Sequence, residues 1–260
     1  MTTRNRKQRQ LAEREQIFLD RAWTMIQNDG VLNLQMSRLA AECEYAVGTL
    51  YLHFTSKEDL LVALASSRIG ERIELFQRAA AWWAPTRHRL FAIVLADMLF
   101  AQRLPEFFNL TQYVSTQAIW AAATAERRAD ALAKSVPLGE AVQRVVGEAI
   151  QNGDVDNHGL SGRELCSGLW AMCVGMHALV GAGGLLETQC EPRPYHLLQL
   201  QAHALLNGLS WRPLMPVDDI AAQRQLTEQI MAELFPEFLA GADVAVLNPL
   251  ASNLGDGLNE

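Results

Sequence analysis

The stretch that decides the fold is LQMSRLAAECEYAVGTLYLHFTSKEDL, residues 34–60. Within it, Leu39, Ala40 and Cys43 recur with the spacing of a buried helical stripe, and apolar side chains repeat that spacing over residues 50–54. Only a tight turn fits between the two stripes. Two short helices joined by a tight turn form a helix-turn-helix, whose second helix lies in the major groove of DNA.

A third helix is expected to follow directly. Ser56 stands where an N-cap belongs, and the acidic residues Glu58 and Asp59 occupy the first helical turn, where the helix dipole favours them. We expect this helix to continue to about Trp83, before Pro85. Such a helix would connect the DNA-binding unit mechanically to the rest of the chain.

The segment Gly48–Leu60, GTLYLHFTSKEDL, resembles the DNA-binding signature of the TetR family of bacterial transcriptional regulators. The resemblance covers residues 13–62. The upstream residues that match the first two helices of that family are Phe18, Leu19, Arg21, Ala22, Met25, Ile26, Gly30, Leu39 and Ala40.

The turn departs from the family pattern. Glu44 stands where the family usually has Gly, at a position that often needs a positive φ. Tyr45 and Ala46 replace the usual Val and Ser or Thr. Ala46 therefore has no hydroxyl with which to cap the second helix.

Helical periodicity and proline punctuation continue beyond the motif, and no strand alternation appears. The sequence thus predicts an all-α fold, in which an N-terminal three-helix DNA-binding unit precedes a larger helical ligand-binding and dimerisation domain. The expected divisions are a basic flexible arm at 1–12, the helix-turn-helix domain at 13–55, the second domain at 56–240 and a flexible tail at 241–260. The further helices expected are 13–29, 88–103, 106–116, 117–152 with a break or kink at Pro137, 161–180, 194–209 and 218–239.

Charge confines the expected DNA contact to the N-terminal end. The net charge is −7, yet residues 1–60 carry as many basic as acidic side chains, so the remainder carries the whole excess. An acidic body repels nucleic acid. The four cysteines show no CxxC spacing, and the polar, basic N-terminus has no apolar stretch typical of a signal peptide, so we expect no signal peptide and reduced thiols in a cytoplasmic protein. These cysteines are Cys43, Cys166, Cys173 and Cys190.

The stretch from Leu165 to Leu186 contains no charged side chain and has the length of a membrane span. Five glycines, one histidine and the lack of a positive flank argue against a span. We therefore expect a buried helix here.

The helix at 46–53 is the expected reading surface for DNA. The family resemblance indicates Thr49, Tyr51 and Lys57 as phosphate contacts. The alternative is that Tyr51 and His53 pack in the three-helix core. The complete set of expected DNA contacts is Gln35, Ser37, Arg38, Val47, Thr49, Tyr51, His53 and Lys57.

The helix at 161–180 separates small from large side chains. In the resembled family the penultimate pair of helices forms a four-helix dimer interface, and the small face paired with helix 194–209 would suit that role. The alternative is close packing of the same residues within one chain. The expected interface residues are Gly168, Ala171, Gly175 and Ala178.

Large apolar residues in the second domain suggest a ligand cavity, with His177, Tyr113 or Gln117 as a polar anchor. Ordinary core packing is the alternative for each of them. The expected lining is Met98, Phe107, Phe108, Tyr113, Gln117, Trp120, Trp170, Cys173, Met176 and His177.

Neither a metal nor a cofactor is expected. The Cys173–His177 pair has chelating spacing but no third ligand, and His196 and His203 lie seven residues apart on one helical face. Motifs of serine hydrolases, zinc peptidases, P-loop proteins and dinucleotide-binding enzymes are missing, so an enzyme is not expected.

Together these features predict a homodimeric regulator that binds a palindromic operator and acts as a repressor released by a small hydrophobic ligand. Ligand would swing the 56–83 helix and move the two recognition helices off their half-sites. Two alternatives stay open. One is a nucleoid-associated protein of the same fold that acts on a protein partner, and the other is a helical carrier or enzyme with a vestigial DNA-binding unit.

Overall fold

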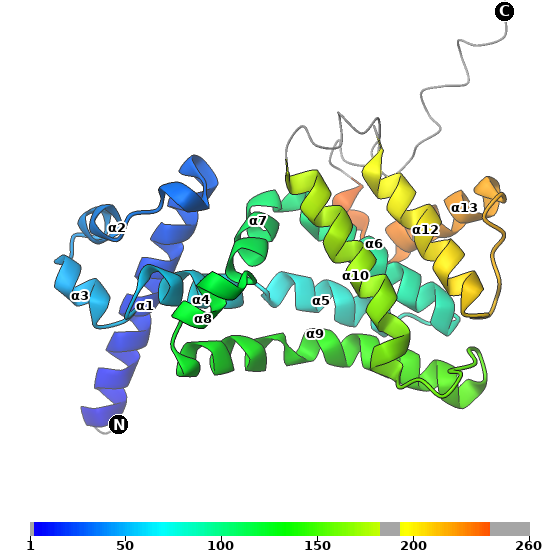
Figure 1. The fold of residues 1–260 in the computed structure, drawn as a ribbon, viewed down its shortest axis with the longest axis horizontal. Helices are drawn as coiled ribbons and strands as arrows, with labels where there is room; N and C mark the ends of the chain where they lie inside the picture. The colour runs from blue at the N-terminus through cyan, green and yellow to red at the C-terminus, as the bar shows by residue number, and fades with distance from the viewer. Residues whose placement is uncertain (1–2, 183–192, 240–260) are drawn as a thin grey trace, which may run out of the picture. The chain divides into compact units, whose positions relative to one another are not determined.

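The computed structural model describes residues 3–182 and 193–239. All regular elements in these ranges are helices, which confirms the all-α prediction. The chain forms two compact units (Figure 1). Unit 1 comprises residues 1–70 and 104–136, and unit 2 comprises residues 71–103 and 137–260.

Unit 1 is built around α1, which packs against the helix-turn-helix and against α4 (Figure 1). Its core includes the fully buried side chains of Phe18, Leu50 and Phe54. Helix α4 also packs on α7 and α8, so residues 104–122 belong to the unit that holds the DNA-binding motif. The elements are α1 (Thr3–Asp29), η1 (Val31–Asn33), α2 (Met36–Glu42), α3 (Val47–Tyr51), α4 (Lys57–Ser67), α7 (Pro105–Val114) and α8 (Gln117–Ala122).

Unit 2 surrounds α6, whose side chains are almost all buried. Helices α10, α12 and α13 pack on it, and α10 also packs along α12 (Figure 1). The elements are α5 (Gly70–Ala80), α6 (Thr86–Arg103), α10 (Gly162–Gly181), α12 (Pro194–Gly208), α13 (Ile220–Leu234) and η2 (Pro236–Phe238). Helix α9 (Ala125–Asn152) begins in unit 1 and ends in unit 2.

The expected single helix from Ser56 to Trp83 is wrong, because α4 ends at Ser67 and α5 starts at Gly70. Ser66 and Ser67 donate their hydroxyls to the carbonyls of Ala63 and Leu64. Such bonds offer the backbone an alternative to the helical ladder. Arg68 then leaves the helical conformation with φ −101° and ψ 2°.

Pro137 was expected to break or kink its helix; α9 continues through this residue, so a break is wrong and a kink stays a prediction. The chain instead leaves the helix at Ala123, where φ is −73° and ψ is 153°. Thr124 restarts it by accepting the backbone N–H of Arg127 at its Oγ1, at 3.2 Å. A side-chain cap three residues ahead is a strong start signal.

Near both termini, the secondary structure of the described residues differs from the expected one. The expected flexible arm at 1–12 is helical from Thr3 onward as part of α1. The last helix ends at Leu234 rather than at 239, because Pro236 cannot donate to the helical ladder. Residues 240–260, which hold the expected tail, lie outside the described residues.

The expectation that helix 161–180 is buried is wrong for one of its faces. By length and composition α10 is one described helix that could cross a bilayer, and 33% of its most apolar window is buried. A single helix of this kind is weak support for a membrane span. Its start is as predicted, because Ser161 and Glu164 form a capping box.

Candidate nucleic-acid interface and ligand cavity

Two backbone hydrogen bonds close the turn between α2 and α3 and terminate α2. The N–H of Tyr45 donates to the carbonyl of Ala40 at 2.9 Å, and that of Glu44 to Ala41 at 3.0 Å. This is the Schellman arrangement, whose C′ residue adopts a left-handed conformation. Glu44 has φ 60°, which confirms the expectation of a positive φ. Ala46 caps α3 without a side-chain bond, also as expected.

The recognition helix α3 presents a short exposed face. Val47 is 39% exposed and Tyr51 is 47% exposed, while Thr49 is half-buried between them. Gln35 and Ser37, at the start of α2, are exposed as well. A hydroxyl, a phenol and an amide on one surface can donate to phosphate oxygens or contact base edges.

The two basic residues of the expected contact set already have partners within unit 1. Arg38 pairs with Asp29 at 2.6 Å and with Glu42 at 2.8 Å. Lys57 donates from Nζ to the carbonyl of Leu32 at 3.2 Å. The pairs of Arg38 are exposed, so they are weak and exchangeable with a phosphate.

His53 does not belong to the exposed face. Its side chain is 3% exposed and packs edge-on against Phe18, with ring centroids 5.5 Å apart. Burial lowers the pKa of His53 and outweighs the carboxylate of Glu15, whose Oε2 lies 3.8 Å from Nδ1. The imidazole is therefore neutral near pH 7. The core-packing alternative describes His53, whereas Tyr51 points to solvent.

Unit 2 contains an apolar cavity of about 440 Å³. This volume lies within the range of small-molecule sites, which are mostly apolar with a few placed polar groups. Helices α5, α6, α9 and α10 each contribute to its wall. The lining residues are Arg72, Phe76, Leu90, Ile93, Val94, Asp97, Leu138, Gly139, Val142, Gln143, Arg163, Cys166, Ser167, Leu169, Trp170 and Cys173.

One buried polar chain stands in this apolar wall. Asp97 accepts from Arg72 at 2.7 Å through Oδ1, and its Oδ2 lies 3.1 Å from Nε2 of His177. The Nδ1 of His177 in turn lies 3.3 Å from the hydroxyl of Tyr195. Burial raises the pKa of Asp97, but the charge of Arg72 and the contact with His177 outweigh it, so the net shift is downward. The carboxylate is therefore ionised and can hold Arg72 in place.

The structure brings together few of the expected ligand contacts. Trp170 and Cys173 line the cavity, and His177 supports it through Asp97. Met98 and Met176 are buried in unit 2 but do not line it. The remaining expected contacts belong to unit 1, where α7 and α8 lie. These are Phe107, Phe108, Tyr113, Gln117 and Trp120.

The buried thiols and histidines of unit 2 do not gather into a metal site. Within the described ranges, no three His, Cys, Asp or Glu side chains converge. Burial raises the pKa of Cys166 to about 11 and that of Cys173 further, so both stay protonated. His203 stacks on Phe91 with ring centroids 4.0 Å apart. Cys190 lies outside the described residues.

The small face of α10 is open to solvent. Gly168, Ala171 and Gly175 are exposed, and Ala178 is half-buried. A Cβ at Gly175 would meet nothing within 4 Å, whereas one at Gly168 would lie 3.7 Å from Leu205. Packing within the chain thus explains little of this face, and its role in a dimer stays a prediction.

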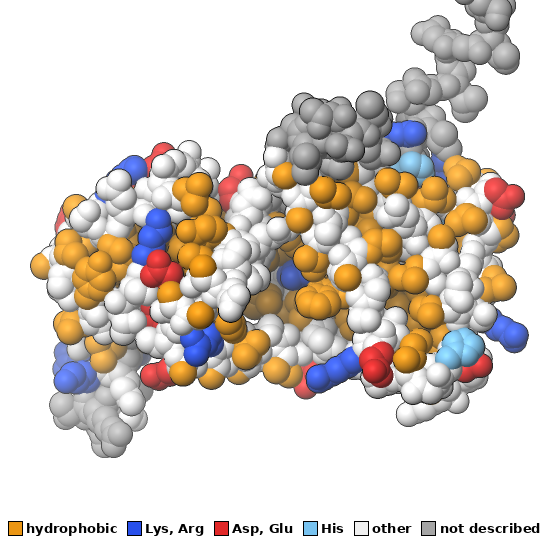
Figure 2. Space-filling model, in the orientation of Figure 1, with side chains coloured by type: hydrophobic (Ala, Val, Ile, Leu, Met, Phe, Trp, Pro, Cys, Tyr) orange, Lys and Arg blue, Asp and Glu red, His pale blue; other side chains and the backbone are white. Residues whose placement is uncertain are grey.

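Apolar side chains surround these small residues on the surface of unit 2. Figure 2 shows hydrophobic side chains gathered over α10 and α12. Trp170 is 68% exposed, and three aliphatic residues of the same helix are also exposed. The aliphatic residues are Val174, Leu179 and Val180. Large exposed apolar patches are typical of interaction sites, and a partner for this one stays a prediction.

The model of the family described as "Bacterial regulatory proteins, tetR family" matches residues 18–64, the segment that holds α2, α3 and the first turns of α4. Residues 18–64 are thus similar to the DNA-binding domain of that family. Among curated proteins, the "Fatty acid metabolism regulator protein" of Bacillus subtilis is 30% identical over 77 residues, which span 30% of this chain and 40% of the relative's length. The activity of the whole chain is a matter for proposal, because this curated relative is matched over less than half of its length.

Solved structures show the same fold. A transcriptional regulator FadR from Bacillus subtilis, in complex with stearoyl-CoA, has a TM-score of 0.54 at 20% identity, covering 75% of this chain and 97% of that one. The TetR-family regulator PfmR from Thermus thermophilus has a TM-score of 0.54 at 16% identity, covering 74% and 98%. At these identities the likeness establishes the fold alone.

Several site residues carry no signal in the sequence. Arg72 and Asp97 are 25 positions apart, and nothing in the local pattern of either indicates a shared cavity. Arg127 reaches back to Glu15 across 112 positions in unit 1. A polar residue at an otherwise apolar helical position, such as Asp97 within α6, is the one hint that the sequence offers.

Proposed function

We propose that this protein is a TetR-family repressor that a hydrophobic ligand releases from its operator. The observation that carries the proposal is that one chain combines an exposed recognition face on α3 with an apolar cavity in unit 2. A ligand changes an equilibrium only by its different affinity for two states of the protein. A cavity walled by four helices supplies such a difference when it is filled.

We infer that the ligand has a long aliphatic chain and a polar, anionic head, as a fatty acyl thioester of coenzyme A does. The cavity wall offers apolar surface, and each methylene buried there contributes about 0.8 kcal/mol. Arg163 belongs to the lining and is exposed, so it can pair with an anionic head that stays in water. The similarity to FadR structures, one of which contains stearoyl-CoA, supports this ligand class.

We further infer a cytoplasmic homodimer that binds a palindromic site. The exposed apolar face of α10, which includes Trp170, supports pairing of two copies along α10 and α12. A two-fold dimer places two recognition helices on half-sites one helical turn apart. Contacts expected from each copy include Thr49 and Tyr51 on α3, and Lys57 at the start of α4.

The test is fluorescence anisotropy with DNA upstream of the gene for this protein, against an unrelated fragment of equal length. Specific binding should survive physiological salt and competitor DNA, whereas pure phosphate attraction weakens steeply with salt. Tyr51→Phe and Lys57→Ala should weaken it, and Lys57→Ala should reduce the salt slope by about 1. Lys134→Ala, which removes a positive charge from α9, is the matched control.

Stearoyl-CoA, butyryl-CoA and free coenzyme A are then added to the complex. We expect stearoyl-CoA to lower operator affinity by about tenfold or more, within the range of allosteric couplings, and the other two to act weakly. Ser167→Trp, which fills the cavity, should abolish the response. Equal binding to both fragments would refute the specific regulator, and equal effects of all three probes would refute the aliphatic ligand.

A further inference from the structure

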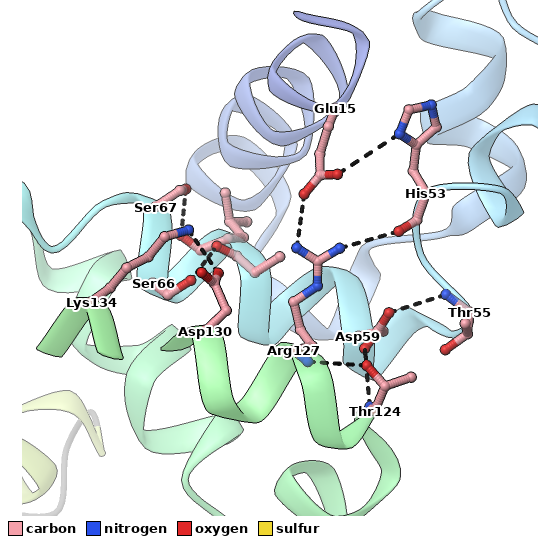
Figure 3. Close-up of polar contacts among 12 residues, drawn as sticks. Glu15, His53, Thr55, Asp59, Ser66, Ser67, Thr124, Arg127, Asp130 and Lys134 are labelled. Carbon is pink, nitrogen blue, oxygen red and sulfur yellow. Dashed lines mark hydrogen bonds and ion pairs between the residues drawn. The ribbon is translucent and has the colours of Figure 1, made fainter. Parts of the chain in front are cut away.

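Arg127 attaches the first turn of α9 to the helix-turn-helix. Its Nη1 pairs with Oε1 of Glu15 at 2.8 Å, and its Nη2 donates to the carbonyl of His53 at 3.2 Å (Figure 3). The guanidinium also lies 5.3 Å from the ring centre of Phe54. His53 and Phe54 follow the recognition helix after its C-cap, Leu52. One planar side chain with several donors therefore ties α1, α9 and the end of α3 together.

Thr124 makes a second attachment beside the first. Its backbone N–H and its hydroxyl both donate to Oδ1 of Asp59, at 3.1 and 2.8 Å (Figure 3). The other oxygen of Asp59 accepts the N–H of Thr55 at 3.2 Å. Burial raises the pKa of Asp59, but the bonds from Thr124 and Thr55 outweigh it and hold the pKa below its usual value. The start of α9 is thus bound to an ionised carboxylate of α4.

The same helix lines the ligand cavity in unit 2. Leu138, Gly139, Val142 and Gln143 of α9 belong to its wall. The chain crosses between the units after Gly70, Arg103 and Val136. The first two crossings lie at helix ends, next to the start of α5 and the end of α6, whereas the third lies inside α9. Pro137 at this third crossing removes one bond of the helical ladder, yet α9 continues through it as helix, so it is the one crossing of the three that is not at a helix end.

We propose that α9 transmits the occupancy of the cavity to the recognition helix, and that Arg127 is the positioning residue through which it does so. This inference rests on the proposed function. It assigns to α9 the linking role that the sequence suggested for a helix over residues 56–83, which is interrupted at Arg68. The partners of the Arg127 guanidinium are Glu15, the His53 carbonyl and the ring of Phe54, none of which belongs to the exposed face of α3. Arg127 fixes where α3 ends, through the carbonyl of His53 and the ring of Phe54.

The experiment uses a substitution as an occupant of known position. Val142→Trp fills the cavity from α9, and Val142→Phe is the milder second variant should the first not fold. We expect either to change amide hydrogen exchange over residues 50–56 by about threefold or more, a coupling of ordinary size. In an Arg127→Ala background, the same substitution should change amide hydrogen exchange over residues 50–56 by only a small fraction of this amount. The double-mutant cycle isolates the coupling from the separate effects.

Two further variants separate positioning from folding. Arg127→Lys keeps the charge but cannot bridge Glu15 and the His53 carbonyl together, so it should restore stability more than coupling. Lys134→Ala, whose side chain pairs with Asp130 on its own helix at 2.8 Å, should leave the coupling intact. An exchange response of the same size with and without Arg127, or no response in the native background, overturns the proposal. Hydrogen exchange needs neither DNA nor natural ligand, so failed operator binding would count against the proposed function alone.

Discussion

Glu44 holds a backbone conformation that suits glycine. Its φ of 60° closes the Schellman turn between α2 and α3. A side chain with a Cβ in the left-handed region costs about 1–2 kcal/mol. The turn persists because the helices on both sides are packed in the core of unit 1, where Leu39 and Leu50 are fully buried.

Glu44→Gly should therefore raise the free energy of unfolding by roughly 0.5–1 kcal/mol, since part of the gain is offset by the larger freedom of glycine in the unfolded chain. Urea denaturation at fixed protein concentration measures it. Operator affinity should stay unchanged, because Glu44 lies outside the exposed face of α3. Glu42→Gly, two residues earlier in α2, should destabilise. If Glu44→Gly also destabilises the protein, the strain argument is incorrect.

His203 is a buried base that the fold keeps neutral. Burial lowers its pKa to about 3, with further lowering from Arg87 and His88. Its Nδ1 lies 3.3 Å from Nη1 of Arg87, so the neutral ring accepts a hydrogen bond there. The pKa of Arg87 is itself lowered to about 10 by burial, yet this side chain stays charged at neutral pH. Protonating His203 would set two buried cations side by side.

The pH dependence follows from the sign of this shift. The folded pKa of about 3 lies below the ordinary 6.5, so between these values the unfolded chain binds a proton that the folded chain does not. Stability from this group is complete above pH 6.5 and declines as pH falls. From pH 7 to pH 5 the loss should be about 2 kcal/mol. His203→Gln, which keeps an acceptor for Arg87, should lose correspondingly less; parallel denaturation curves for the two proteins would contradict the assignment.

At the scale of elements, local signals were readable from sequence and long-range ones were not. The caps at Ser56 and Ser161 were predicted because each depends on residues three positions apart. The end of α4 at Ser67 was missed because serine is an acceptable helix residue, and only its bonding to earlier carbonyls reveals the end. Pro137 does not end α9, because a proline removes one bond of the helical ladder but the flanking turns keep theirs.

The candidate site divides in the same way. The recognition helix could be located because its residues are consecutive, and Tyr51 is exposed as the motif implies. The cavity could not be predicted from sequence. Its wall combines four helices, and only tertiary packing decides which side of each helix faces the others. The aromatic residues of α7 and α8 were assigned to the cavity on composition alone, and they belong to unit 1.

The capping box of α10 should contribute measurably to the free energy of unfolding of unit 2. The N–H of Ser161 donates to Oε2 of Glu164 at 2.8 Å, and the N–H of Glu164 donates to Oγ of Ser161 at 3.4 Å. Ser161→Ala should cost about 1 kcal/mol in thermal or urea unfolding. Ser167→Ala on the same helix removes a hydroxyl without removing a cap and should be close to neutral. If both variants lose a similar amount of unfolding free energy, the capping hydrogen bonds do not contribute more to stability than an ordinary surface hydroxyl.

At the scale of the whole molecule, the proposed function requires that two recognition helices act together. One α3 offers few base contacts, because Thr49 and Tyr51 are its main polar groups and no Arg or Asn on it reads guanine or adenine in a bidentate manner. A single unit should therefore bind weakly. Joining two units makes the second half-site contact effectively intramolecular, which raises affinity without any new contact.

Trp170→Asp should separate the copies by placing a charge in the apolar face of α10, where burial without a partner is costly. Sedimentation should show a monomer, and affinity for a full palindrome should fall about a hundredfold, toward that for an isolated half-site. Trp83→Asp is the matched control, because Trp83 is also in unit 2 and is 100% exposed, away from α10 and α12 in the sequence. Because Trp170 also lines the cavity, ligand binding is measured in parallel. A variant that stays dimeric would remove α10 from the interface, and a monomer with undiminished affinity would show that each half-site is bound independently.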